Sequence, residues 1–546
     1  MKLDSLRRII PVFEKTVQFL FVLFVSICCF FSIIYHGDLN QQTYSEKLNY
    51  CLNNPRIVIW LLAMLAFILA IAGLTQWRKD KTAFVFVLMC GIVAVGGSIA
   101  FSLWNGYTPV SDQEQMWEGG IQLVYGDSVS FRREYYEIYH NQVGGALLAA
   151  FLIRLTGSRS FMSWRILNSV CVGLIVYGLS FLSQMIRRDN HCMIITALLS
   201  VMFVPMIIYS SLVYGTLIAL SLTIWSFLFL LLFIRRDRFR YMVISVVLCA
   251  CANLVYSGTM IATVAIVLIL LAYAVQKGLQ EKKQCLGIVL AAILVVALCY
   301  SSSYAAQKFF YTKTGIDASQ GLPATAYIYM GITSDDESSV CGPGTYNSSS
   351  VNLYNDNNKN AKQTRAAAAE KIKEALVDYA TGRRSMDFFI KKIRNQWADP
   401  WFSSMIMVIN YYDIDRPLKE SFRSFLSSSL IGKIQTYLTA YRIIVYMGVL
   451  LYGLRSFRRK DCGKTIWENL LMFTFFVGGF VFYTAWEAKA RYCLPYFVLL
   501  LPFAAAELAR SSGIVKKWME RRILKSFFGK NQLNKRTYEE FANGRS

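Results

Sequence analysis

Apolar runs long enough to cross a lipid bilayer recur along the whole chain and constrain its fold more than any other feature. Residues 56–76 and 285–304, for example, continue for about 20 residues almost without charge. A helix of that length rises about 1.5 Å per residue and spans the roughly 30 Å hydrocarbon core of a bilayer. Because 55% of the residues are hydrophobic and only 17% are charged, a soluble domain could not bury this much apolar surface. The sequence therefore predicts an all-α, polytopic integral membrane protein.

We expect about twelve transmembrane helices and one further interfacial or re-entrant helix. The further helix is residues 143–156, which are apolar but would reach only about 21 Å as a helix and carry Arg154. If it does not cross, the basic turns between the spans share one side with both termini, and the positive-inside rule makes that side the cytoplasm of a plasma-membrane protein. The expected spans are approximately 17–35, 56–76, 83–104, 165–186, 192–212, 214–234, 241–257, 258–276, 285–304, 434–454, 465–485 and 492–510.

This topology divides the chain into six parts, of which two face outward. Within the larger outward part, alanine-rich residues 361–379 predict a surface helix, and residues 334–360, rich in Ser, Asn, Gly and Asp, predict turns and an exposed loop. The expected parts are an N-terminal three-span segment (1–104), a first outer loop with the interfacial helix (105–164), a transmembrane core (165–304), an extracytoplasmic loop domain (305–433), C-terminal spans (434–510) and a basic cytoplasmic tail (511–546).

The formal charge of +23 does not require a nucleic-acid partner, because basic cytoplasmic turns are how membrane proteins fix their orientation. A histidine-based metal centre is also not predicted. The chain has three histidines, and most of its 13 cysteines lie inside apolar runs, where a thiol acts as a small hydrophobe.

An acidic and aromatic loop begins directly after the apolar run that ends near Trp104. Asp112 and Glu114 lie there in a chain that is otherwise basic. Either carboxylate could accept a proton from an attacking hydroxyl, a step to which a positioned base contributes about 10² to 10⁴ in rate. The alternative is that Asp112 caps the helix predicted to start at this point, with Ser111 as the competing cap. Both roles stay open at this stage.

Two further polar stretches should meet this loop if helix ends at the same membrane level cluster. They are residues 137–142 and residues 487–492. In the second, Arg491 or Lys489 would hold an anionic phosphate leaving group. The alternative, equally open, is that the charges of residues 487–491 cap a short loop between two spans. The tyrosines of both stretches, with Tyr135 and Tyr136, fit an interfacial aromatic belt.

Several short motifs resemble those of one enzyme superfamily. The likeness is to GT-C glycosyltransferases, and most of all to bacterial relatives of protein O-mannosyltransferases and of the lipid A aminoarabinose transferase (glycosyltransferase family 39-like). Three stretches resemble the first outer loop of these enzymes: Thr108-Pro109-Val110-Ser111-Asp112-Gln113, Tyr139-His140-Asn141-Gln142-Val143-Gly144, and Leu155-Thr156-Gly157 before Arg165. The outer-loop glycine pattern is matched by Tyr327 to Ile332 with Gly344-Thr345-Tyr346. The entry to the last core span is matched by Glu487 to Pro495.

The resemblance implies transfer of a sugar from a polyprenyl-phosphate donor to a glycan, protein or glycolipid acceptor on the outer face of the bilayer, with inversion at the anomeric carbon. It implies that Asp112 is the catalytic carboxylate, with Glu114 as a second candidate, and that Arg491 contacts the donor phosphate. The one cofactor that the residues suggest is a divalent cation, which Asp112 and Glu114 could share with a phosphate. The other candidates are Lys489 and Arg165 for the phosphate, and Tyr139, His140, Asn141, Gln142, Glu487 and Tyr492 for the sugars.

The chain also departs from the pattern of that superfamily. Tyr214 is followed by Gly215 and Thr216 where an acidic residue is common, and residues 253–259 lack a basic residue that relatives often carry. Two other functions are therefore kept, a lipid-linked glycan flippase or transporter and a glycan polymerase or ligase. The scarcity of ionisable residues at mid-depth in the spans argues against a transporter.

Overall fold

The computed structural model describes residues 3–39, 48–75, 80–278, 282–316, 321–333, 342–409, 417–458 and 466–513. Within these ranges eight helices are long and apolar enough to cross a bilayer, and a bent pair, Ala490–Val498 with Leu501–Gly513, forms a ninth candidate span. The predicted fold class, an all-α polytopic membrane protein, is confirmed. The long helices are α1 (Leu3–Ile34), α3 (Asp80–Asn105), α7 (Met162–Ile186), α10 (Thr216–Arg236), α12 (Met260–Gly278), α13 (Lys282–Thr314), α20 (Ser429–Arg458) and α21 (Trp467–Ala485), and α22 (Ala490–Val498) begins the bent pair.

The remaining three expected spans correspond to shorter apolar helices, α2 (Ile57–Thr75), α8 (Asn190–Met202) and α11 (Phe239–Val255). One expected span, 192–212, is interrupted, because α8 ends and α9 (Val204–Tyr209) begins with Pro205 in its first turn. Proline lacks the N–H that would continue the helical hydrogen bonds, so a helix breaks before it. Apolar composition predicted this segment, but the break shortens the continuous helix.

The first loop leaves and rejoins the bundle at the same end. Arg165, near the start of α7, donates hydrogen bonds to the carbonyls of Ser102 and Tyr107, at and just beyond the end of α3. Between these points α6 (Val143–Thr156) packs along α4 (Asp112–Tyr125). A Cβ on Gly120 would lie 2.5 Å from the Cβ of Ala149, so only glycine permits this close approach. We call this end of the bundle the Asp112 end.

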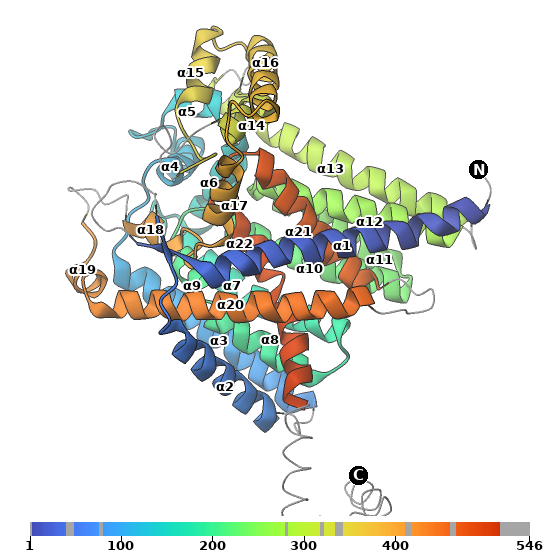
Figure 1. Cartoon of the computed structure of the whole chain (residues 1–546). Helices are drawn as coiled ribbons and strands as arrows, with labels where there is room; N and C mark the ends of the chain where they lie inside the picture. The colour runs from blue at the N-terminus through green and yellow to red at the C-terminus, as the bar shows by residue number, and fades with distance from the viewer. Residues whose placement is uncertain are drawn as a thin grey trace, which may run out of the picture.

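Small helices lie beyond the long helices at the Asp112 end (Figure 1). Three of them, α14 (Ala324–Thr333), α15 (Ser349–Asp356) and α16 (Ala361–Ala380), pack on one another. The helix predicted at 361–379 is confirmed by α16. The loop predicted at 334–360 is wrong over α15, and residues 334–341 lie outside the described residues. The other short helices are α5 (Arg133–Ile138), η1 (His140–Gln142), η2 (Ser257–Thr259), α17 (Asp387–Trp397), α18 (Ser404–Ile409) and α19 (Glu420–Leu426).

A two-stranded antiparallel sheet, β1 (Tyr35–Asp38) and β2 (Asn49–Leu52), is the β structure of the described ranges. It ties α1 to α20, since Gln435 donates to Asp38 (2.9 Å) and Arg442 donates to the carbonyl of Tyr35 (3.0 Å). Neither four-residue stretch, YHGD or NYCL, alternates between apolar and polar residues, so the sequence shows no strand pattern here.

The opposite end of the bundle carries basic side chains, among them Arg187 after α7, Arg235 on α10 and Arg455 on α20. This agrees with the basic turns on which the predicted orientation depends, and the orientation itself stays a prediction. Residues 76–79, 279–281, 459–465 and the expected tail from 514 onward lie outside the described residues.

Candidate active site

Asp112 is the first residue of α4, and its side chain faces two tyrosines. Its Oδ1 accepts a hydrogen bond from the hydroxyl of Tyr135 (3.0 Å) and its Oδ2 accepts one from the hydroxyl of Tyr214 (3.3 Å). Ser111 precedes the helix with a positive φ of 54° and makes no side-chain cap hydrogen bond. The carboxylate of Asp112 is therefore turned toward other segments. Its position in the first turn also lets the helix dipole stabilise the negative charge.

Gln113 fixes this turn against the segment that carries Tyr214. Its Nε2 donates to the hydroxyl of Tyr107 (2.7 Å), and its Oε1 accepts the backbone N–H of Val213 (2.8 Å). Because both groups of the buried amide are used, the start of α4 and the segment before α10 are held in one arrangement. Gln113 therefore holds the segments that carry Asp112 and Tyr214 next to each other.

Tyr214 also joins Asp112 to Arg491, at the start of α22. The hydroxyl of Tyr214 donates to Asp112 and accepts from Nη1 of Arg491 (3.1 Å). The guanidinium lies between two rings, 4.9 Å from the centroid of Tyr214 and 5.1 Å from that of Tyr492. Such stacking holds a guanidinium in one orientation. A carboxylate and a cation that are far apart in the sequence thus share one phenol.

A second phenol extends this chain of hydrogen bonds to Glu487. Nη2 of Arg491 donates to the hydroxyl of Tyr492 (3.3 Å), which donates to Oε2 of Glu487 (3.4 Å). The predicted candidates Asp112, Arg491, Glu487 and Tyr492 are therefore brought together. Tyr214 appeared in the sequence only as a tyrosine that is not followed by the acidic residue common in the superfamily, and its bridging role was not predicted.

Further tyrosines surround the carboxylates and stay protonated. Burial raises the pKa of Tyr135 well above its usual value, and the negative charge of Asp112 raises it further. Burial likewise raises the pKa of Tyr139, with Tyr346 and its hydrogen bond as the next cause. Burial and then the charge of Glu487 raise the pKa of Tyr327, whose ring stacks on Trp486 with centroids 5.1 Å apart. Neutral phenols of this kind are donors for carboxylates and for sugar hydroxyls.

The tyrosines that were expected in an aromatic belt lie in different surroundings. Tyr136 is fully buried and donates to the carbonyl of Gln115 (2.6 Å), while Tyr135 and Tyr492 belong to the hydrogen bonds around Asp112 and Arg491. A belt residue has to face the membrane interface. The buried Tyr136 is therefore not a belt residue, whereas the half-buried Tyr135 and Tyr492 contribute to the hydrogen bonds around Asp112 and Arg491.

The glycines of the outer-loop motif pack on the segment that leads to Glu487. A Cβ on Gly331 would lie 2.4 Å from the carbonyl oxygen of Ala485, and the carbonyl of Gly344 accepts the N–H of Ala488 (2.7 Å). Gly344 also has a φ of 74°, which favours glycine. The two motifs that resemble the superfamily thus contact each other and fix the approach to α22.

Lys392 of α17 holds the same segment and was missed at the sequence level. Its buried Nζ donates to the carbonyls of Gly331 (2.6 Å), Thr484 (2.9 Å) and Trp486 (2.8 Å). The neighbouring Lys391, by contrast, forms a surface ion pair with Asp387 (2.9 Å). Nothing in the amphipathic sequence of α17 distinguishes the two lysines, because the difference depends on which face meets the end of α21.

We expect Lys392→Met to lower activity and to destabilise the protein by about 2 kcal/mol or more, because three buried carbonyls lose their donor. Burial lowers the pKa of Lys392 to about 7. In the unfolded chain the pKa of Lys392 is near 10.5, so between pH 7 and pH 10.5 the unfolded state binds one proton more than the folded state. The free energy of unfolding therefore rises with pH in that window. Activity should fall above pH 7, since the neutral amine has two donors for three carbonyls.

A pH profile of activity and thermal unfolding in detergent measure both effects. Lys391→Met is the matched control on the same helix and should change neither. If the activity of the Lys392→Met variant fell above pH 7 in the same way as that of the wild type, this role for Lys392 would be contradicted.

The remaining sequence candidates lie apart from the Asp112–Arg491 pair or are less closely tied to it. Arg165 is buried, and one N–H of each of its three guanidinium nitrogens donates to a carbonyl, those of Ser102, Tyr107 and Ser211, so this side chain braces the first outer loop. His140 packs edge-on against Tyr311 (5.6 Å). Three further candidates, Glu114, Gln142 and Lys489, are half-buried, and Asn141 is exposed.

A dedicated cation site does not fit these side chains. In the described part of the chain no three His, Cys, Asp or Glu side chains come together as ligands. Both oxygens of Asp112 accept hydrogen bonds from tyrosines. The divalent cation that Asp112 and Glu114 suggested in the sequence therefore enters none of the steps below.

Comparisons with known proteins agree with membrane embedding. A family model described as "Conserved hypothetical integral membrane protein" matches residues 9–512. No curated protein matches. Among solved structures, the Archaeoglobus fulgidus oligosaccharyltransferase tethered with an acceptor peptide containing the NVT sequon is 11% identical, and the match covers 84% of this chain. This chain spans about half of that protein (52%), and the TM-score of 0.41 is too low to establish a shared fold.

Proposed function

The chain belongs to the family described as conserved hypothetical integral membrane protein, and we propose that it is a membrane glycosyltransferase of GT-C type. It moves a sugar from a polyprenyl-phosphate donor to an acceptor on the extracytoplasmic face, in modification of a cell-envelope glycan, protein or glycolipid. The observation that carries this proposal is the phenol of Tyr214, which joins the carboxylate of Asp112 to the guanidinium of Arg491.

A carboxylate and a guanidinium in this arrangement supply a general base for the acceptor hydroxyl and a cation for the leaving phosphate, the two groups that glycosyl transfer from a phosphate requires. Asp112 accepts the proton of the acceptor hydroxyl as its oxygen attacks the anomeric carbon. The bond between that carbon and the phosphate oxygen breaks, and the electron pair leaves with the phosphate. Arg491 stabilises the charge that develops on the leaving phosphate. Attack opposite the leaving group inverts the anomeric carbon.

Apolar and aromatic side chains lie beside the guanidinium of Arg491. A narrow cavity lined mainly by apolar and aromatic side chains adjoins it, with Tyr256, Pro495 and Tyr496 among its walls. Tyr492 contributes to both regions, since its hydroxyl accepts from Arg491 and it also lines this cavity. The cavity has a volume of only about 10 Å³, so a polyprenyl tail would have to widen it to place its phosphate beside Arg491. The neutral phenols of Tyr139 and Tyr327 are then available to the sugar.

The direct test separates chemistry from translocation. Purified protein in proteoliposomes receives polyprenyl-phosphate sugars that are radiolabelled in the sugar, together with an extract of cell-envelope acceptors. A glycosyltransferase releases polyprenyl phosphate and moves the label to an acceptor. Movement of intact donor across the bilayer, with no cleavage, would instead establish the flippase alternative. Growth of label into long chains would establish a polymerase.

We expect Tyr214→Phe to reduce the transfer rate roughly 10- to 100-fold, the value of one hydrogen bond to a charged group. The ring that stacks on Arg491 remains, so the protein should fold normally. Initial rates and thermal unfolding measure the two effects. Tyr50→Phe is the matched control, because Tyr50 also stacks on an arginine, Arg394, at the Asp112 end (4.7 Å) and donates to a carbonyl. Equal rates in both variants would remove Tyr214 from the mechanism.

A further inference from the structure

A cavity of about 500 Å³ opens at the end of the bundle opposite to Asp112. It lies between the ends of α7 and α20, the start of α21 and the helix Leu501–Gly513. Four arginines line it, Arg187, Arg455, Arg458 and Arg510, with one carboxylate, that of Glu507. The site around Asp112 uses none of these residues, so the cavity needs an explanation of its own.

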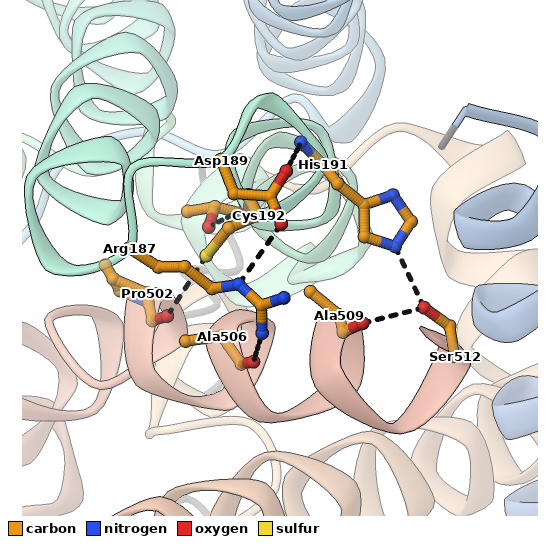
Figure 2. A network of polar contacts seen from close by, with 9 residues as sticks. Arg187, Asp189, His191, Cys192, Pro502, Ala506, Ala509 and Ser512 are labelled. Carbon is orange, nitrogen blue, oxygen red and sulfur yellow. Dashed lines mark hydrogen bonds and ion pairs between the residues drawn. The ribbon is translucent and has the colours of Figure 1, made fainter. Parts of the chain in front are cut away.

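Two of the arginines build the walls. Nε of Arg187 donates to Asp189 (3.1 Å), and its Nη1 donates to the carbonyl of Ala506 (3.2 Å). Figure 2 shows this guanidinium reaching from the α7–α8 turn to the helix Leu501–Gly513, beside the hydrogen bond between His191 and Ser512 (2.9 Å). Arg455 forms an ion pair with Glu507, whose side chain is only 4% exposed. These contacts hold the cavity open in one shape.

The other two arginines supply charge that no carboxylate offsets. In the described ranges, Arg458 and Arg510 form no ion pair, and both are exposed at the cavity. Asn469 adds a polar wall, fixed by the hydroxyl of Tyr452 (3.0 Å) and by Ser456 (3.2 Å). The cavity thus combines a rigid frame with two exposed arginines that no carboxylate of the described ranges pairs.

From this arrangement we propose that the cavity binds a phosphate-bearing anion, and that its occupant is the headgroup of an anionic lipid. Guanidinium groups bind phosphate oxygens through paired N–H donors, and several arginines around one hollow are the pattern expected of such a site. The volume falls in the range of small-ligand sites. Ile186 and Ala506 add apolar wall, and a basic pocket between membrane helices is where acidic lipid headgroups bind.

The same chemistry could come from a free phosphate compound, so the experiment includes both sources. Purified full-length protein in an uncharged detergent is titrated with fluorescent phosphatidylglycerol, with fluorescent phosphatidylcholine, and with inorganic phosphate and pyrophosphate as competitors. The test variant is Arg458→Gln with Arg510→Gln. The matched control is Arg188→Gln with Arg238→Gln, which removes the same charge from exposed arginines at the same end but outside the cavity. Neither pair contacts the Asp112 site.

We expect phosphatidylglycerol to bind more tightly than phosphatidylcholine, and the test variant to weaken that binding roughly 10-fold or more. The control variant should bind as the wild type does. Pyrophosphate that displaces the lipid and binds equally well alone, with the same dependence on Arg458 and Arg510, would overturn the lipid source and support a soluble phosphate compound. If the test and control variants lost phosphatidylglycerol binding equally, or if the wild type did not prefer phosphatidylglycerol to phosphatidylcholine, the proposed site would be overturned.

Discussion

Asp112→Asn should reduce sugar transfer by roughly 10² to 10⁴, the contribution of a positioned general base. The amide keeps nearly the same shape and can still accept one tyrosine hydrogen bond, but it cannot take a proton from the acceptor. Folding should be unaffected, because Gln113 and Arg165 hold the loop independently of this carboxylate. Initial transfer rates, with thermal unfolding of the same preparations, measure the effect.

Asp127→Asn is the matched control for this substitution. Asp127 follows α4 and forms an ion pair with Arg159 at the surface (2.7 Å), with its side chain 56% exposed. Its loss should leave the transfer rate unchanged, since exposed ion pairs contribute little. A wild-type rate in the Asp112→Asn variant would remove Asp112 from the mechanism. A loss accompanied by unfolding would assign it a structural role.

The second large effect is expected at Arg491. Arg491→Met removes the cation that we propose to face the leaving phosphate, and the loss in kcat/KM for the donor should reach roughly 10² to 10³. Arg491→Lys keeps the charge but loses the planar contacts with the phenols of Tyr214 and Tyr492, so it should recover only part of the rate. Kinetics at varied donor and at varied acceptor concentration separate donor use from acceptor use.

Arg394→Met is the control that removes a comparable arginine. Arg394 also lies between two rings, those of Tyr35 (5.5 Å) and Tyr50 (4.7 Å), at the Asp112 end. It has no contact with Asp112 or Glu487, so donor kinetics should not change. Equal losses for donor and acceptor in the Arg491 variants would contradict a role in holding the phosphate.

The features that the sequence predicted depend on local properties of the chain. Apolar runs predicted the membrane helices, and alanine-rich composition predicted α16 to within one residue. The interruption between α8 and α9 was not foreseen, although Pro205 marks it. The pairing of β1 with β2 was also missed, because neither strand alternates between apolar and polar residues.

The site was predictable where a motif marks it and unpredictable where packing decides. The resemblance pointed to Asp112 and Arg491, which the fold brings to one phenol. That phenol, Tyr214, lies in an otherwise ordinary apolar stretch. Lys392 was missed because burial on α17 depends on contacts with distant segments. Arg165 was expected at a phosphate for its charge, but its donors are used by carbonyls that only the folded chain brings near.

The measurement that tests the central proposal most directly is donor consumption by purified protein. A panel of polyprenyl-phosphate sugars is offered in detergent with envelope acceptors, and release of polyprenyl phosphate is followed for the wild type and for the Asp112→Asn variant. We predict that one donor is cleaved, that its sugar appears on an acceptor, and that the variant does neither while it still binds the donor. Binding of donors without cleavage by the wild type, or cleavage that continues without Asp112, would contradict the proposal.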